Sequence, residues 1–194
     1  MILAYKGFDR DLSCTSGANR FQYALDCWNE EPEANCRENG FHCAENPLDC
    51  LNYYPEWKKS VYYLVAAGGD IDEDEVDSKI SCTRLRLIKP LTLEEFVAHS
   101  MNYIWNHPLR KDHGSVRKER GTACNGFVIV RGKAPKAKGG MGDVLGFIKE
   151  ERQSKRAGEM GLYVVDGEKI LPDTWYNIYG RPAQNPEKGV QAAG

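Results

Sequence analysis

The chain has 194 residues, enough for one domain or for one domain with a small appendage. Apolar residues make up 41% of it and charged residues 28%, a composition that excludes disorder throughout and predicts a packed core. No apolar run approaches the roughly 20 residues of a membrane helix, and the first residues lack the basic and apolar regions of a secretory signal. We therefore expect a cytoplasmic protein that does not enter a membrane.

The net charge of −2 hides opposite charges in the two parts of the chain. Residues 1–77 carry 16 acidic and 6 basic side chains (−10), and residues 78–194 carry 12 and 20 (+8). The acidic part is densest at Asp70, Asp72, Glu73, Asp74, Glu75 and Asp77. The basic part is densest at Arg110, Lys111, Arg117, Lys118 and Arg120. Such polarity can steer a charged partner, so both clusters are candidate interaction surfaces, although solvated loops are the simpler interpretation.

The chain has seven cysteines, an odd number that favours free thiols in a reducing compartment. Cys27, Cys36, Cys43 and Cys50 lie 9, 7 and 7 positions apart. A structural zinc site usually includes a tight C-x(2–4)-C pair, and these spacings contain none. We expect no metal and no cofactor.

Runs of β-branched and aromatic residues, separated by turn residues, predict strands in the first part of the chain. They cover residues 2–8, 21–23, 41–43, 60–66 and 80–88. A short helix is expected over residues 47–54, because Asn46 can cap it and Pro47 suits its first turn. A longer helix is expected over residues 92–105, where apolar residues recur at helical spacing.

The texture of the chain changes after this helix. Residues 109–122 are basic and polar and are predicted to be a linker. Short strands are expected beyond it at residues 126–130, 144–148, 162–165 and 175–179. Asp166-Gly167, between two apolar pairs, predicts a two-residue hairpin turn.

These elements predict an α+β fold, with a curved mixed or antiparallel sheet and two helices, followed by a small all-β C-terminal appendage. The expected parts are an N-terminal module (1–108), the basic linker (109–122), the β appendage (123–180) and a flexible tail (181–194). The expected core consists of Leu3, Tyr5, Phe41, Leu48, Leu51, Val61, Tyr63, Val65, Phe96, Val97, Met101 and Ile104.

Several catalytic signatures are absent from the sequence. It contains no phosphate-binding loop that opens a helix, no nucleophile elbow and no H-E-x-x-H pair. The basic segments have few aromatic neighbours, so nucleic-acid binding is a minor alternative. The catalytic residues are therefore unknown.

One segment resembles a known enzyme family. Residues 40–54, GFHCAENPLDCLNYY, are similar to the part of poly-ADP-ribose polymerase-like ADP-ribosyltransferases in which a G-x-Y-F-A turn precedes a short helix ending in Tyr. The resemblance implies a split, bent sheet that grips NAD. Lys6 takes the place of the family's ribose-binding His or Arg, and His42 that of its nicotinamide-stacking Tyr. Lys6, His42 and Tyr53 are therefore the candidate residues of a ligand cleft.

A second resemblance covers most of the chain. The motifs YKGF at residue 5, FQY at residue 21, C-x(3)-GFH-x(3)-NPLD-x-L-x-YY over residues 36–54 and DSKI at residue 77 resemble a family of uncharacterised phage and prophage proteins. Residues 134–179 are similar to the β-rich C-terminal cap of that family. The resemblance implies a viral or mobile-element origin, with the cytoplasm of the host cell as the place of action.

Three functions follow as alternatives. We expect a non-enzymatic phage-encoded protein that binds a host or phage macromolecule, such as a component of a host defence system. The first alternative is an NAD-dependent ADP-ribosyltransferase-like enzyme, or a nucleotide-binding relic of one. The second is a structural or assembly protein of the phage particle, paired through exposed strand edges. A deep cleft between Lys6, His42 and Tyr53 would favour a ligand, and a filled core there would favour protein recognition.

Overall fold

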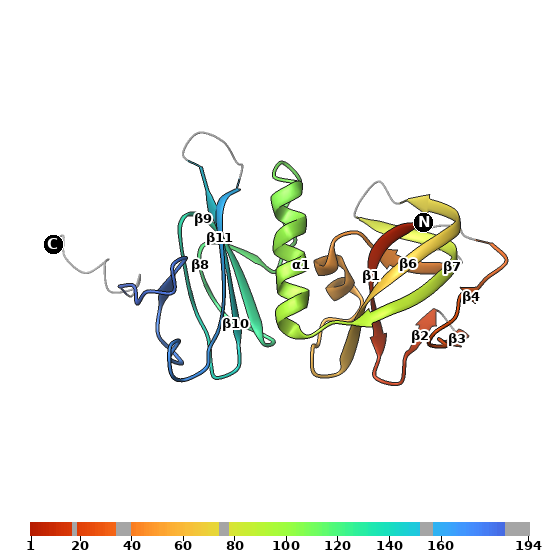
Figure 1. Cartoon of the computed structure of the whole chain (residues 1–194), viewed down its shortest axis with the longest axis horizontal. Coiled ribbons are helices and arrows are strands. Elements are labelled where there is room, and N and C mark those ends of the chain that lie inside the picture. Colours follow the sequence, from red (N-terminus) through yellow and green to blue (C-terminus); the bar gives the residue numbers. More distant parts are fainter. Residues whose placement is uncertain (17–18, 34–39, 74–77, 152–156, 185–194) are drawn as a thin grey trace. The chain divides into compact units, whose positions relative to one another are not determined.

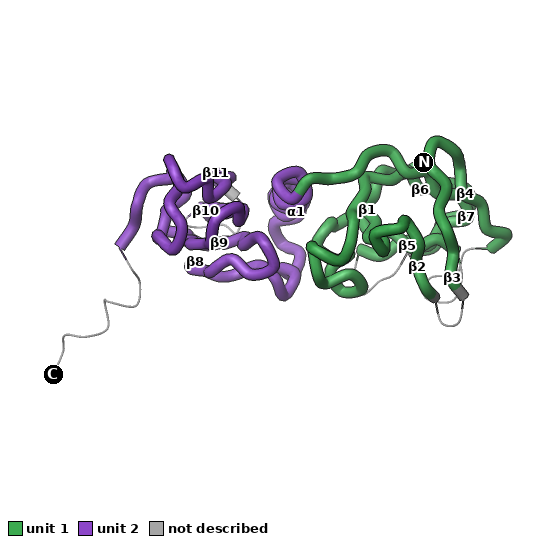
Figure 2. Tube along the Cα trace, turned by 90° about the horizontal axis from the view of Figure 1, so that it is seen from below, with its two compact units in different colours: residues 1–92 green, residues 93–194 purple. Residues whose placement is uncertain are grey.

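The computed structural model describes residues 1–16, 19–33, 40–73, 78–151 and 157–184. The chain forms two compact units, residues 1–92 and 93–194 (Figure 2). The division lies earlier than the boundary at residue 108 that we expected from the sequence, so the long helix belongs to the second unit. Of the expected interaction residues and tail, Asp74, Glu75, Asp77 and residues 185–194 lie outside the described residues.

The first unit is built around a closed ring of four antiparallel strands (Figure 1). The ring strands are β1 (Ile2–Asp9), β5 (Phe41–Ala44), β6 (Ser60–Glu73) and β7 (Lys79–Pro90). Strands β1 and β7 each pair with both β5 and β6, which closes the ring. The sheet that we expected to be curved, or split as in the transferase family, is therefore closed on itself.

Three short strands of the described part of this unit accompany the ring. They are β2 (Ser13–Ser16), β3 (Asn19–Gln22) and β4 (Asn29–Glu30). Strands β2 and β3 form an antiparallel pair, and β4 extends the main sheet next to β7. The 3-10 helix η1 (Pro47–Asn52) lies between β5 and β6 in the chain.

The longest strand, β6, contains an irregularity where the sequence predicted its end. Its register against β7 shifts between Gly68 and Ile71, which is the signature of a β-bulge. Gly69 has φ +73°, and a Cβ there would lie 2.0 Å from Oγ1 of Thr83, so the position requires glycine. Thr83 Oγ1 instead accepts a hydrogen bond from the backbone N–H of Asp70 (3.0 Å). The glycine pair bends the strand without ending it.

The short helix begins as the sequence predicted. The side chain of Asn46 accepts a hydrogen bond from the backbone N–H of Leu48 (3.1 Å), and Pro47 occupies its first turn. The helix is of the 3-10 type and ends at Asn52, two residues before the expected end. Asp49 reaches from this helix to the residue before β7, where its Oδ2 accepts from the Ser78 hydroxyl (2.6 Å). This contact fixes the helix beside the ring.

The core of the first unit fills the ring. Its buried members are Ala4, Phe8, Tyr23, Phe41, Cys43, Val65, Ala67, Ile80, Cys82, Leu85 and Leu87. Even-numbered residues of β1 therefore face inward. Leu3, which we expected in the core, is 59% exposed, and Tyr5 is only partly buried. Leu51, Val61 and Tyr63 are also only partly buried, whereas the remaining expected core residues are buried.

In its described residues, the second unit is a five-stranded sheet with one helix. Its elements are α1 (Leu93–Asn106), β8 (Val116–Thr122), β9 (Phe127–Lys138), β10 (Val144–Glu150), β11 (Ala157–Val164) and β12 (Tyr176–Asn177). Strand β9 pairs in parallel with both β8 and β10. The helix packs on β10 through Val97 and Met101, and a Cβ on Gly146 would lie only 2.8 Å from Sδ of Met101. Gly146 has no side chain, and this allows the helix to lie close to β10.

Two expectations for this region differ from the structure. The basic segment that was predicted to be a linker contains β8, which pairs with β9. Asp166-Gly167 does not form a two-residue hairpin, because residues 167–170 form a bend and no strand. Asp166 Oδ1 instead accepts backbone hydrogen bonds from Glu168, Lys169 and Ile170 (2.8–2.9 Å). These contacts lower the pKa of Asp166, chiefly through the Ile170 N–H.

The chain is thus mainly β-structure, with α1 and η1 as the helices among the described residues. The expected α+β class is accurate only in that sheets and helices are both present, since the sheets dominate both units. Within the part of the chain that the structure describes, no helix has the length and apolar character needed to cross a membrane.

Candidate functional site

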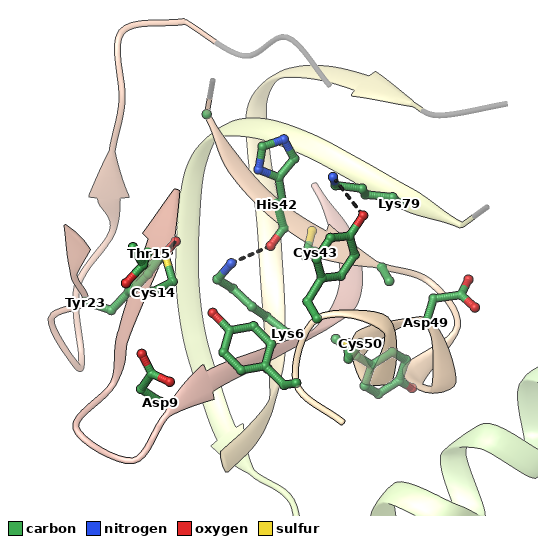
Figure 3. A pocket seen from close by; sticks show the side chains of 16 residues that line it. Lys6, Asp9, Cys14, Thr15, Tyr23, His42, Cys43, Asp49, Cys50 and Lys79 are labelled. Carbon is green, nitrogen blue, oxygen red and sulfur yellow. Dashed lines mark hydrogen bonds between the residues drawn. The ribbon is translucent and has the colours of Figure 1, made fainter. Parts of the chain in front are cut away.

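A pocket of about 580 Å³ opens in the first unit where β1 and β5 part (Figure 3). These strands are in register only at Tyr5 and Ala44, so their ladder does not close the surface around that pair. Strand β2, helix η1 and the start of β7 complete the wall. The three residues predicted to form a ligand cleft, Lys6, His42 and Tyr53, all line this pocket.

Lys6 is the only residue of the inner face of β1 that carries a charge. Its side chain is 6% exposed, between the core residues Ala4 and Phe8. The ammonium donates a hydrogen bond to the backbone carbonyl of His42 (2.6 Å) and lies 5.4 and 5.3 Å from the ring centres of Phe8 and Tyr23. No carboxylate of the described residues lies within ion-pair distance of it. An ammonium has three N–H donors, so Lys6 can bind further acceptors from the pocket.

His42 lies beside two ammonium groups. Burial, together with the smaller effect of the charges of Lys79 and Lys6, lowers the pKa of His42 to about 4. The imidazole is therefore neutral at pH 7 and offers one donor and one acceptor nitrogen. A negative charge placed in the pocket would oppose the two ammonium groups and raise this pKa.

Tyr53 and Lys79 stand together at the edge of the pocket. Lys79 Nζ donates to the Tyr53 hydroxyl (3.2 Å) and lies 4.8 Å from the centre of its ring. Tyr53 is 59% exposed. The contact joins the end of η1 to the first residue of β7 and places a second positive charge at the pocket.

Two further tyrosines provide flat apolar walls. Burial raises the pKa of Tyr23 and of Tyr54, so both phenols stay neutral at pH 7. The Tyr54 ring lies directly on the backbone of β1, since a Cβ on Gly7 would be 2.7 Å from Cδ2 of Tyr54. Neither Tyr54 nor Gly7 was singled out from the sequence, although a glycine inside a predicted strand is a known sign of such a close approach.

Two of the thiols that line the pocket, Cys50 and Cys43, are not activated. Burial raises the pKa of Cys50 to about 12. A hydrogen bond with Cys82 and burial raise the pKa of Cys43. A thiol becomes a good nucleophile when its pKa falls, so these two side chains serve as small packing groups. Among the described residues, no group of three or more His, Cys, Asp or Glu side chains is placed to hold a metal ion.

The structure does not bring the expected interaction residues to the pocket. Asp70 and Asp72 are exposed on β6, and Glu73 is the last residue of that strand. In the second unit, Arg110 and Lys111 follow α1, whereas Arg117, Lys118 and Arg120 are exposed on β8. Arg117 donates to the backbone carbonyl of Gly114 (3.3 Å) and Arg110 to the hydroxyl of Tyr103. Their binding of a macromolecule stays a prediction.

Comparison with known proteins gives a family but no activity. No curated protein and no solved structure matches this chain. One family model matches residues 2–99, and its description is a domain of unknown function (DUF7666). The match covers the whole ring, η1 and the pocket between them. The chain belongs to the DUF7666 family.

Proposed function

We propose that the first unit binds a small organic anion with a flat apolar body in the pocket beside Lys6. The observation that carries this proposal is the buried ammonium of Lys6, which faces a cavity and has no carboxylate partner among the described residues. Burial of an uncompensated charge is costly, and an anion in the cavity would offset that cost.

The size and walls of the pocket support this choice. Pockets that enclose small molecules have volumes of roughly 300–1,000 Å³, and the volume of this one is about 580 Å³. Neutral phenol rings at Tyr23 and Tyr54 suit a flat apolar body. Lys79 adds a second positive charge at the edge, which favours the same class of ligand.

Binding is proposed in preference to catalysis because of the chemistry of the pocket residues. The raised pKa values of Cys43 and Cys50 oppose nucleophilic attack by these thiols, and the lowered pKa of His42 makes its imidazole a weak general base near neutral pH. Of the two carboxylates that line the pocket, Asp49 is committed to Ser78 and to Asn46 Nδ2 (3.3 Å), whereas Asp9 has one long contact to the Ser13 hydroxyl (3.5 Å). These features support a receptor for a ligand more than an enzyme.

The test is calorimetric titration with benzoate, phenyl phosphate and NAD, the last because of the transferase resemblance. We expect benzoate and phenyl phosphate to bind, and Lys6→Met to weaken both at least tenfold, which is about 1.4 kcal/mol. Lys58→Met is the matched control, because Lys58 is exposed and lies outside the pocket. No binding at millimolar probe, or equal binding to Lys6→Met, would overturn the proposal. Release of nicotinamide from NAD would instead establish transfer chemistry.

A second candidate is recognition of a phage or host macromolecule, favoured by the three exposed cations of β8. A partner with an acidic surface would associate faster at low salt. The same pattern also protects the edge of a sheet from unwanted pairing, which makes it weaker support than the pocket. Measurement of binding to host and phage lysate proteins at low and high salt tests it, and absence of a partner at both would remove it.

A further inference from the structure

The carboxylates in and near the pocket differ in how many hydrogen bonds and ion pairs they accept. Asp49 Oδ2 accepts from the Ser78 hydroxyl (2.6 Å) and from the Ser78 N–H (3.1 Å). Asp11 accepts from the Ser13 hydroxyl (2.7 Å) and pairs with Arg20. Asp9 has one long contact, 3.5 Å to the Ser13 hydroxyl, which lies much closer to Asp11. Of these three acids, Asp9 alone has most of its acceptor capacity unused, and it lines the pocket.

Asp9 and Lys6 face the same hollow from one strand. Figure 3 shows Asp9 beyond Lys6, at the end of β1, and both residues line the pocket. Their Cα atoms are three residues apart, which spans about 10 Å of a strand. The ring of Tyr54 lies over Gly7, between them along the chain. Burial, then Cys14, and then the charge of Asp9 raise the pKa of Tyr54. The Asp9 carboxylate therefore influences the part of the pocket next to Tyr54.

We propose that the pocket selects a bipolar ligand, with its anionic group at Lys6, a cationic group at Asp9 and a flat apolar body between them. This inference rests on the proposed function, because it adds a second contact to the same bound molecule. Asp9 is exposed, so its pairing with a ligand ammonium is worth a few-fold in affinity. A ligand with only the cationic group would meet the repulsion of Lys6 and Lys79.

Three probes of one shape test this inference by calorimetry or NMR titration. They are 4-(aminomethyl)benzoate, which carries both charges, 4-methylbenzoate, which lacks the ammonium, and benzylamine, which lacks the carboxylate. In the unmodified protein we expect 4-(aminomethyl)benzoate to bind about three- to fivefold more tightly than 4-methylbenzoate. Benzylamine should bind most weakly of the three.

Two variants locate the effect. Asp9→Asn should remove the advantage of the aminomethyl group, because the amide has no charge to pair with it. Glu45→Gln removes the same charge from an exposed residue outside the pocket and should keep the advantage. Thermal denaturation of both variants shows whether the fold is retained.

The outcomes separate this inference from the proposed function. Equal affinity for the two benzoates, or an advantage that survives Asp9→Asn, would overturn the bipolar ligand and leave anion binding standing. Failure of both benzoates to bind would overturn the proposed function itself. Loss of the advantage in Asp9→Asn alone, with 4-methylbenzoate binding unchanged there, would support both.

Discussion

Among the described residues, each unit buries one cationic side chain, and the two differ in their partners. Lys6 of the first unit is 6% exposed and Arg131 of the second unit is 5% exposed. Arg131 donates to Asp112 Oδ1 (2.7 Å) and to the Pro108 carbonyl (2.8 Å), and its Nε lies 2.9 Å from Oε1 of Glu150. Lys6 has a single carbonyl acceptor. Burial of a charge is therefore a weak sign of function until its partners are counted.

The cavities beside these cations lead to the same conclusion. The pocket around Arg131 has a volume of about 630 Å³, slightly larger than the one around Lys6. Its central cation is already neutralised by two carboxylates, so an incoming anion would gain little there. Size alone would choose the second pocket, whereas the unmatched charge indicates the first.

The largest expected effect on stability comes from removing Arg131, which is paired with Asp112 and Glu150. Arg131→Met should destabilise the second unit by about 3 kcal/mol, because it leaves Asp112 and Glu150 without their partner in a partly buried place. Chemical denaturation, followed by NMR signals of β9 and β10, measures it. Lys133→Met, at an exposed position of the same strand, is the control and should change stability by less than about 0.5 kcal/mol. Equal effects of the two substitutions would mean that the network is not structural.

Removal of Lys6, which has no carboxylate partner among the described residues, should have the opposite effect on stability. Lys6→Met should leave the first unit as stable as before or stabilise it by about 1 kcal/mol, because an apolar chain replaces a buried charge without a counter-ion. Water in the pocket can take over the bond to the His42 carbonyl. For a unit of this size, such a gain corresponds to a rise in Tm of about 4–8 °C. A loss of several degrees would show that Lys6 holds the ring together and is not reserved for a ligand.

A further difference is the pH dependence that His42 contributes to the first unit. Its pKa is about 4 in the folded protein and near 6.5 in the unfolded chain, so between these values only the unfolded chain takes up the proton. The stability of the first unit should therefore fall as the pH is lowered from about 6.5 to 4. His42→Gln should flatten this part of the Tm profile, whereas His107→Gln, at an exposed position after α1, should not. An unchanged slope in His42→Gln would contradict the assignment.

The sequence predicted most strands of the first unit but not how they close. Strand positions follow from local composition, whereas the ring depends on pairings such as Leu3 with Ala66 and Phe41 with Cys82, which join distant parts of the chain. The inner face of β1 was predicted with the wrong parity, because side chains alternate between faces and an error of one residue exchanges them. Apolar Leu3 lies outside and charged Lys6 inside, so hydrophobicity alone could not correct the error.

The candidate site was predicted in part, and through a resemblance. Lys6, His42 and Tyr53, which were singled out through the similarity to transferases, line one pocket, and their binding of a ligand stays a prediction. Asp9 was missed because it stands out only by its few hydrogen-bond partners. Hydrogen-bond partners cannot be read from a sequence. Tyr54 was not singled out either, because its place in the pocket depends on its close approach to the backbone of Gly7.

The closed ring also sets an order of events during synthesis. Strand β1 finds its neighbours in β5 and β6, but both of these stay open on their other side until β7 has emerged. A nascent chain that ends before Lys79 therefore exposes two unpaired strand edges. Such edges can pair with other chains. Strand β7 covers both edges when it pairs. A pause of translation before β7 would therefore be the stage at which the nascent protein most needs a chaperone.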